Sequence, residues 1–126
     1  MTLILGALLG FISVAFGAFA EHGLRANVTE EDFRFLMTAV RYNQVNAAVI
    51  ISIGLTLLSS ERLANIQPLR WSGLLFIAGT LLFSFSIYVS ISLDMPSLLN
   101  ITPTGGITIM AAWLLLLASG VMVAKK

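Results

Sequence analysis

Four long apolar stretches, separated by short polar segments, dominate the pattern of the chain. They lie at about residues 3–22, 42–60, 69–93 and 104–124. A helix needs roughly 20 apolar residues to cross the hydrocarbon core of a bilayer, and each stretch reaches that length. The pattern therefore predicts an all-α integral membrane protein, folded as an antiparallel four-helix bundle in one domain that covers residues 1–126.

The segment at about residues 29–41 has an amphipathic pattern instead. Thr29 is a predicted N-cap, Asp32 sits at the capping-box position, and further acids complete the first turn. Apolar and charged residues then fall on separate faces, as they do in helices that lie at a membrane interface. We predict that this helix continues into the second span, and a kink near Arg41 is the alternative.

Small residues follow one face of the first span, at alternating steps of four and three residues. Lipid tails are as apolar as leucine, so membrane helices associate through the close packing that small side chains permit. The first span is therefore predicted to be the central helix of the bundle, and Gly23 is the expected end of this helix. The helix-packing residues are Gly6, Gly10, Ser13, Gly17 and Ala20.

Composition agrees with a membrane protein, because 58% of the residues are hydrophobic and only 10% are charged. A soluble domain carries about 25% charged residues. The net charge is +1 and no basic stripe is present, which argues against a nucleic-acid partner. The chain has no cysteine, so disulfides, thiolate metal sites and cysteine nucleophiles are excluded.

Lys and Arg residues in short loops orient a membrane protein, because their excess faces the cytoplasm. The side that holds both termini has Arg62, Arg70, Lys125 and Lys126, and the other side has Arg25, Arg34 and Arg41. This bias of four to three predicts that both termini of the multi-pass membrane protein lie in the cytoplasm.

An even number of spans brings most polar residues of the helices to one end of the bundle. The first and third spans end there, and the second and fourth begin there. Polar side chains at membrane depth must find partners, and a bundle offers them one another. The candidate polar cluster comprises His22, Arg41, Tyr42, Asn43, Asn46, Ser84, Ser86, Tyr88, Thr102 and Thr104.

Each of these residues has a structural interpretation beside a functional one. His22 either bonds loose carbonyls at its helix end or serves as a proton relay, metal ligand or lipid-headgroup contact. Arg41 either extends its side chain to the interface or binds a substrate carboxylate. Asn43 and Asn46 either hydrogen-bond between helices or line a pore. The segment 102–106 either packs the fourth span on the first or offers amides to an anion.

Local pairs are expected to be structural. Glu21 and Arg25 are four residues apart, but Gly23 between them is expected to end the helix and leave both solvated. Ser84 and Ser86 can bond carbonyls of their own helix.

Four segments, in order, resemble a known family: Gly17–Leu24, Ala39–Tyr42, Leu82–Tyr88 and Thr102–Gly106, followed by Trp113. Together they are similar to the family of small four-span membrane proteins known as domain of unknown function 423, which includes transmembrane protein 256. The resemblance covers almost the whole chain. It implies a four-helix inner-membrane protein and no established activity.

The chain departs from that family at two positions. The family usually has a second histidine four residues after the tyrosine of the second span, where this chain has Asn46, and a glycine where it has Phe85. If the family used two histidines to hold haem or a metal, this chain could not do so in the same way. We expect no cofactor and no metal.

Three classes of function remain. We favour a structural or accessory subunit that lies in membrane lipid and packs against itself or within a larger membrane complex. The alternative is binding or transport of a small solute or lipid through the polar cluster, although the spans lack an embedded acid for proton coupling. An enzyme ranks last, because the sequence contains no catalytic set of residues.

Overall fold

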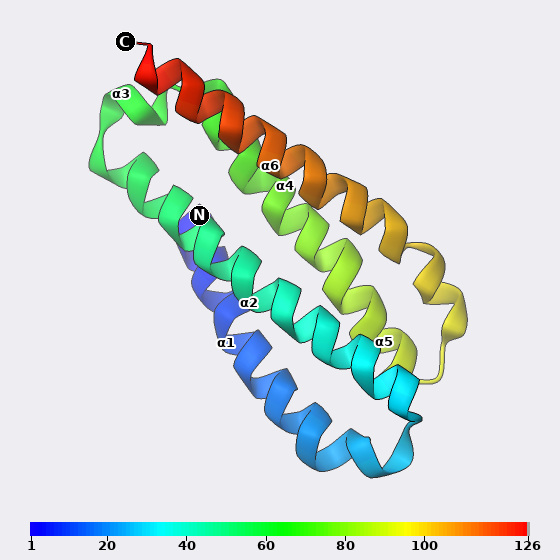
Figure 1. Cartoon of the computed structure of the whole chain (residues 1–126). Coiled ribbons are helices and arrows are strands. Elements are labelled where there is room, and N and C mark those ends of the chain that lie inside the picture. The colour runs from blue at the N-terminus through cyan, green and yellow to red at the C-terminus, as the bar shows by residue number, and fades with distance from the viewer. Residues whose placement is uncertain (126) are drawn as a thin grey trace.

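The structure is a computed structural model that describes residues 1–125, and the regular secondary structure in this range is helical. Four helical segments run the length of the molecule: Thr2–Asn27, Glu30–Ser59, Gln67–Ser92 and Pro96–Ala124 (Figure 1). Each is long and apolar enough to cross a membrane. The predicted all-α bundle of four spans is confirmed.

The first span does not end at Gly23, so that prediction is wrong. Helix α1 (Thr2–Phe19) continues through a π-helical turn, η1 (Ala20–Leu24), and a 3-10 turn, η2 (Arg25–Asn27). None of the described glycines has a positive φ, so the left-handed cap that ends many helices does not form. Because the chain stays helical, Arg25 reaches back to Glu21, and the two form an ion pair whose side chains remain exposed.

The second span is one helix, α2 (Glu30–Ser59), which is continuous through Arg41. The backbone N–H of Asp32 donates a hydrogen bond of 3.1 Å to Oγ1 of Thr29, which confirms the predicted N-cap. The amphipathic segment thus continues into the span without the alternative break. Ser60 then adopts an extended conformation and ends the helix before the short α3 (Glu61–Ala64).

The third span contains a π-helical turn at its middle. It consists of α4 (Gln67–Thr80), the π-helical turn η3 (Leu81–Phe85) and α5 (Ser86–Ser92). Pro68 occupies the first turn of α4, where its missing N–H costs no intrahelical bond. After the span, Asp94 has a φ of 50°, a left-handed conformation that aspartate tolerates, and the chain reverses there.

The fourth span begins earlier than the sequence indicates. The segment between the predicted third and fourth spans includes the 3-10 helix η4 (Pro96–Asn100), and α6 (Thr102–Ala124) follows it. Pro103 lies in the first turn of α6, as Pro68 does in α4.

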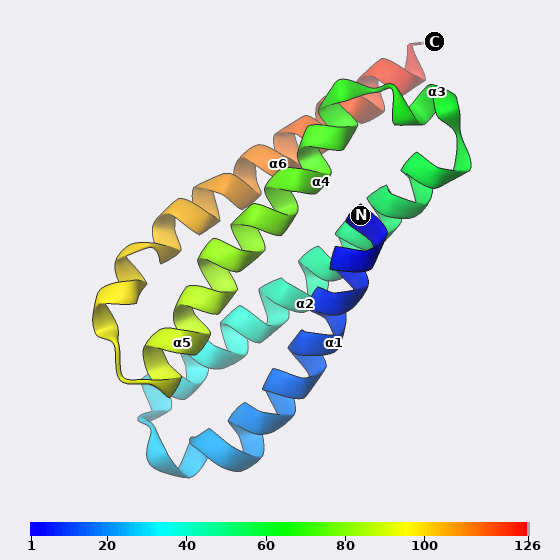
Figure 2. The same cartoon turned by 180° about the vertical axis from the view of Figure 1, so that it is seen from behind.

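The helices form two hairpins, and α2 and α4 lie between α1 and α6 (Figures 1 and 2). Helix α1 packs chiefly on α2, α6 chiefly on α4, and α2 packs on α4. In the 18-residue apolar stretch of each span, 50% of the residues are buried in the third span, compared with 22% in the first. The prediction that the first span is the central helix of the bundle is therefore wrong. Its small residues lie on a single face of the helix, so they allow close packing against one neighbouring helix.

The small face of α1 lies against α2. A Cβ atom on Gly6 would lie 2.9 Å from the backbone nitrogen of Ile51. From the other side, a Cβ on Gly54 would lie 2.7 Å from the backbone nitrogen of Leu3. Two backbones that approach this closely need glycine at the contact. The small residues that line this seam on the first span are Gly6, Gly10, Ser13, Gly17 and Ala20.

The fourth span packs on the third span rather than on the first, which corrects the structural interpretation of the segment 102–106. A Cβ on Gly105 would lie 2.7 Å from the carbonyl carbon of Leu82 in η3. A Cβ on Gly79 would lie 2.6 Å from Cγ1 of Ile109. Glycines on both helices therefore allow close contact, and α1 has no part in it.

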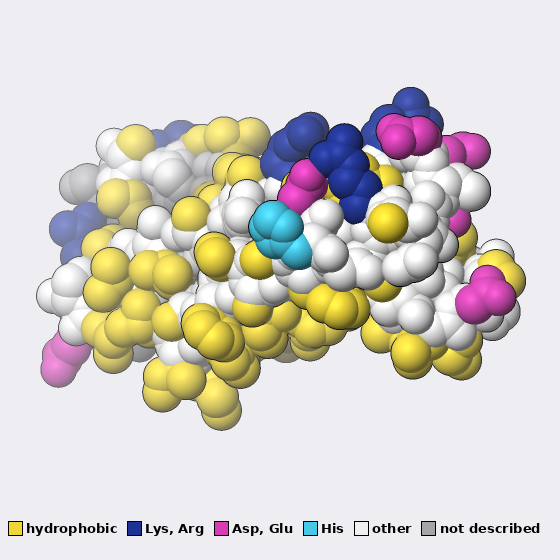
Figure 3. Space-filling view, turned by 90° about the horizontal axis from the view of Figure 1, so that it is seen from below, with side chains coloured by type: hydrophobic (Ala, Val, Ile, Leu, Met, Phe, Trp, Pro, Cys, Tyr) yellow, Lys and Arg dark blue, Asp and Glu magenta, His cyan; other side chains and the backbone are white. Residues whose placement is uncertain are grey.

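The core consists of two apolar clusters along these seams. One surrounds Ile50 and Phe76, which are fully buried, and the other surrounds Leu36, Ala39 and Tyr88 at the end where α1 meets α2. The outer surface is also largely hydrophobic, and in the view of Figure 3 the charged side chains lie in separate groups along the upper edge and at the left and right margins. This is the distribution expected of a protein whose outer solvent is lipid.

Candidate functional site

A buried hydrogen bond connects the two hairpins near their centre. Nδ2 of Asn46 in α2 donates to Oγ1 of Thr80 in α4 at 3.0 Å, and Thr80 in turn donates to the carbonyl of Phe76 at 2.7 Å. Both side chains are almost fully buried. Thr80 is absent from the predicted cluster, although it lies four residues before Ser84 and so on the same helical face. This four-residue spacing from Ser84 is the sequence signal that could have identified Thr80.

A second buried contact joins α2 to α5. Nδ2 of Asn43 donates to the hydroxyl oxygen of Tyr88 at 3.2 Å. The ring of Tyr88 stacks on Phe16 of α1, with ring centroids 3.9 Å apart. Tyr88 therefore links three spans. Oδ1 of Asn43 is buried without a hydrogen-bond partner among the described residues.

Two serines near the π-helical turn make further contacts between helices. Oγ of Ser84, within η3, donates to the carbonyl of Ala39 in α2 at 2.7 Å. Oγ of Ser86 lies 2.6 Å from Oγ1 of Thr102 at the start of α6, and it also bonds the carbonyl of Phe83 in its own helix. Ser84 thus bonds across the bundle, whereas Ser86 bonds both locally and across it.

The structure separates the other candidate residues from this cluster. His22 in η1, Arg41 in α2 and Thr104 in α6 are exposed. Tyr42 is also exposed and lies against the ring of Phe83, with centroids 4.9 Å apart. Six candidates take part in separate hydrogen bonds between helices of the bundle: Asn43, Asn46, Ser84, Ser86, Tyr88 and Thr102.

Sequence reasoning also missed a polar contact at the opposite end. Oγ of Ser72 in α4 donates to the carbonyl of Ala112 in α6 at 2.9 Å, and Ser72 is fully buried. A single serine in an apolar helix carries no pattern that would reveal its partner. Among residues 1–125, no three His, Cys, Asp or Glu side chains lie close enough to hold a metal ion.

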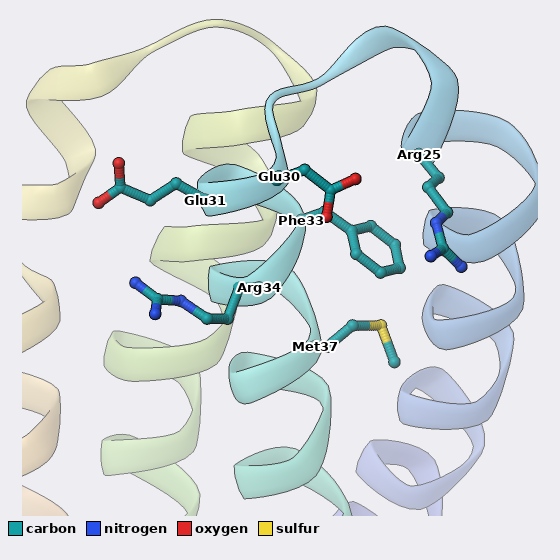
Figure 4. A pocket seen from close by; sticks show the side chains of 6 residues that line it. All are labelled: Arg25, Glu30, Glu31, Phe33, Arg34 and Met37. Carbon is teal, nitrogen blue, oxygen red and sulfur yellow. The ribbon is translucent and has the colours of Figure 1, made fainter.

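An open hollow of about 760 Å³ lies at the charged end of α1 and α2. Figure 4 shows its lining side chains, with Arg25 and Phe33 on one side and Arg34 and Glu31 on the other. The guanidinium carbon of Arg25 lies 4.8 Å from the centre of the Phe33 ring, a distance at which a cation is attracted to the ring face. This hollow is open and charged, whereas the buried polar cluster is closed and neutral.

These features define a small integral membrane protein whose four helical spans are joined by short turns and by neutral hydrogen bonds between helices. The chain belongs to the family described as "Protein of unknown function (DUF423)", whose profile matches residues 16–106. The predicted family is confirmed, and with it a membrane protein to which no molecular function is assigned.

Relatives in several bacteria are similar over almost their whole length. The UPF0382 membrane protein SH2409 of Staphylococcus haemolyticus is 34% identical, over 93% of this chain and 92% of its own. The UPF0382 membrane protein YwdK of Bacillus subtilis is 30% identical, over 94% of each. The UPF0382 inner membrane protein YgdD of Escherichia coli K12 is 29% identical, over 98% of this chain and 92% of its own. No solved structure matches the chain.

Proposed function

We propose that the protein is a structural or accessory subunit of the membrane, whose bundle offers a groove to a transmembrane helix of a neighbouring subunit. The observation that carries the proposal is Gly120 in α6. A Cβ at this position would meet nothing within 4 Å, whereas Gly79 and Gly105 are held by close contacts inside the chain. Glycine inside a helix is about 1 kcal/mol less favourable than alanine. The close approach of a helix from another subunit would account for a glycine at this position.

Gly120 borders an apolar groove between α2 and α6. The groove consists of two adjoining hollows of about 340 and 500 Å³, which share Thr56, Leu69 and Leu116. Oγ1 of Thr56 already donates to a carbonyl of its own helix, so the groove demands no polar partner. Small residues elsewhere along it leave room for another backbone, as interfaces between membrane helices require. These small residues are Ala48, Ser52, Ser119, Gly120 and Ala124.

The interior supports a structural role over solute transport. The hydrogen bonds of Asn46 with Thr80, and of Ser84 with Ala39, use polar groups that a solute path would need. They hold the hairpins together instead. We further propose that the protein has no enzymatic activity and no nucleic-acid partner, and that its partners are membrane lipid and either a second copy or a larger membrane complex.

We also propose that both termini face the cytoplasm. The support is the charge bias of the sequence, four Lys and Arg residues against three. A reporter fused after Lys126 should be active only if it is cytoplasmic. A reporter active only outside would reverse the orientation.

Photocrosslinking in native membranes tests the subunit proposal. A photoreactive residue at Val123, which lines the groove, should give a protein adduct of discrete mass, equal to a dimer or to a complex with another subunit. The same probe at Leu8, exposed on α1, is the matched control and should give lipid adducts only. Filling the groove with Gly120→Leu should remove the protein adduct. Lipid adducts alone at Val123, or a solute flux that Asn46→Leu abolishes, would contradict the proposal.

A further inference from the structure

We propose that Arg41 and Gln44, beside a hollow between α1 and α2, bind the phosphate of an anionic phospholipid. The site lies on the α1–α2 seam, far along the bundle from the groove at Gly120. It does not depend on the subunit role proposed above.

The depth of Arg41 in the membrane is the first argument. Between Arg41 and the end of α2 lie 18 uncharged residues, 42–59, which extend roughly 27 Å at 1.5 Å per residue. This is close to the hydrocarbon thickness of about 30 Å. The neighbouring Val40 packs at Gly17, four residues before Glu21, the first charge of the chain. Arg41 therefore lies within roughly 6 Å of the level at which α1 leaves the hydrocarbon.

The charge of Arg41 is the second argument. Its side chain is exposed, and within residues 1–125 the one ion pair joins Glu21 to Arg25. The nearest acid on α2, Asp32, is nine residues away, or roughly 13 Å along the helix. A guanidinium at the edge of the hydrocarbon needs an anion, and its fork of N–H donors matches a phosphate. At this depth the anion that a membrane supplies is the phosphodiester of a lipid.

The shape of the surface is the third argument. A hollow of about 340 Å³ lies beside Arg41 and Gln44, between α1 and α2. Gly17 and Ala18 line its α1 side with little bulk, so the first part of an acyl chain fits below the phosphate. Met37 lines this hollow and also the larger charged hollow that contains Arg34 (Figure 4). A headgroup above the phosphate would therefore lie toward a hollow that is lined by Arg34 together with Glu30 and Glu31.

Native mass spectrometry of the whole protein in detergent tests this inference, with phosphatidylglycerol and phosphatidylcholine titrated in turn. The protein should bind phosphatidylglycerol more tightly. Arg41→Gln should reduce that preference about fivefold, as expected for one basic residue at an anionic surface. Arg41→Lys should retain part of the preference. Arg70→Gln, an equal loss of charge at the opposite end, is the matched control and should leave it unchanged.

Two further measurements distinguish a built site from general attraction. Ala18→Phe fills the hollow and keeps every charge, and it should weaken phosphatidylglycerol binding as much as Arg41→Gln does. Both positions are exposed, and circular dichroism checks that both variants are folded. Excess inorganic phosphate should not displace the lipid.

The proposal is overturned if Arg41→Gln keeps the preference, if Arg70→Gln loses as much, if Ala18→Phe has no effect, or if inorganic phosphate competes as a free ligand. Photocrosslinking from Val123 in the Arg41→Gln protein separates this result from the subunit proposal. That adduct should persist whether or not the lipid binds.

Discussion

The side-chain amide of Asn46 donates a 3.0 Å hydrogen bond to the hydroxyl of Thr80, a residue 34 positions further along the chain. This bond connects α2 to α4 and therefore one hairpin to the other. Thr80 is also bonded to the carbonyl of Phe76, so both of its hydrogen-bonding roles are used. The two polar side chains therefore satisfy each other inside the bundle, as polar groups at membrane depth must.

We predict that Asn46 and Thr80 are energetically coupled. A double-mutant cycle with Asn46→Leu and Thr80→Val should give a coupling of about 0.6 kcal/mol, the average for hydrogen bonds between membrane helices. Reversible unfolding in mixed micelles provides the measurement. As a control, the effects of Asn46→Leu and Ser72→Ala on the free energy of unfolding should be additive. Ser72 bonds the carbonyl of Ala112 in the contact between α4 and α6, about 12 Å along α4 from Thr80. A coupling near zero for the first pair would mean that the bond contributes nothing to folding.

We predict opposite effects for two glycines of the same helix. In Gly105→Ala the new methyl group would lie 2.7 Å from the carbonyl carbon of Leu82 and 2.8 Å from Cα of Phe83. The backbones must separate, and the free energy of unfolding should fall by about 1–3 kcal/mol. In Gly120→Ala the methyl meets nothing within 4 Å, and the isolated protein should gain up to about 1 kcal/mol. Equal destabilisation by both would contradict the packing of α6 on the third span.

We predict that two serines of the third span, Ser84 and Ser92, differ in their contribution to stability. Oγ of Ser84 bonds the carbonyl of Ala39, so Ser84→Ala should reduce the free energy of unfolding by about 0.5–1 kcal/mol. Oγ of Ser92 is buried and has no partner among the described residues, so Ser92→Ala should be neutral or slightly stabilising. The same unfolding measurement serves both variants. If Ser92→Ala proved the costlier change, the assigned contacts of Ser84 and Ser92 would be wrong.

The sequence predicted the number of spans, their approximate bounds and the N-cap at Thr29. It also predicted a cluster of polar residues, six of which take part in separate hydrogen bonds between helices. It did not reveal Thr80 or Ser72 as partners, and it left open the placement of His22 and Arg41, which are exposed. A serine or threonine hydroxyl can donate a hydrogen bond to a carbonyl of its own helix or to a group on another helix, at a similar cost in free energy. The residue type and its spacing in the sequence therefore do not identify the partner.

What the sequence alone determined is therefore what depends on local physics: which segments prefer lipid to water, and where a helix can begin. Tertiary structure decided the rest. It placed α2 and α4 at the centre, where they pack on each other and each packs on one outer helix. It carried the first span past Gly23, because the residues after this glycine continue as helical turns. Pairing depends on helix order and rotation, which no single stretch of sequence contains.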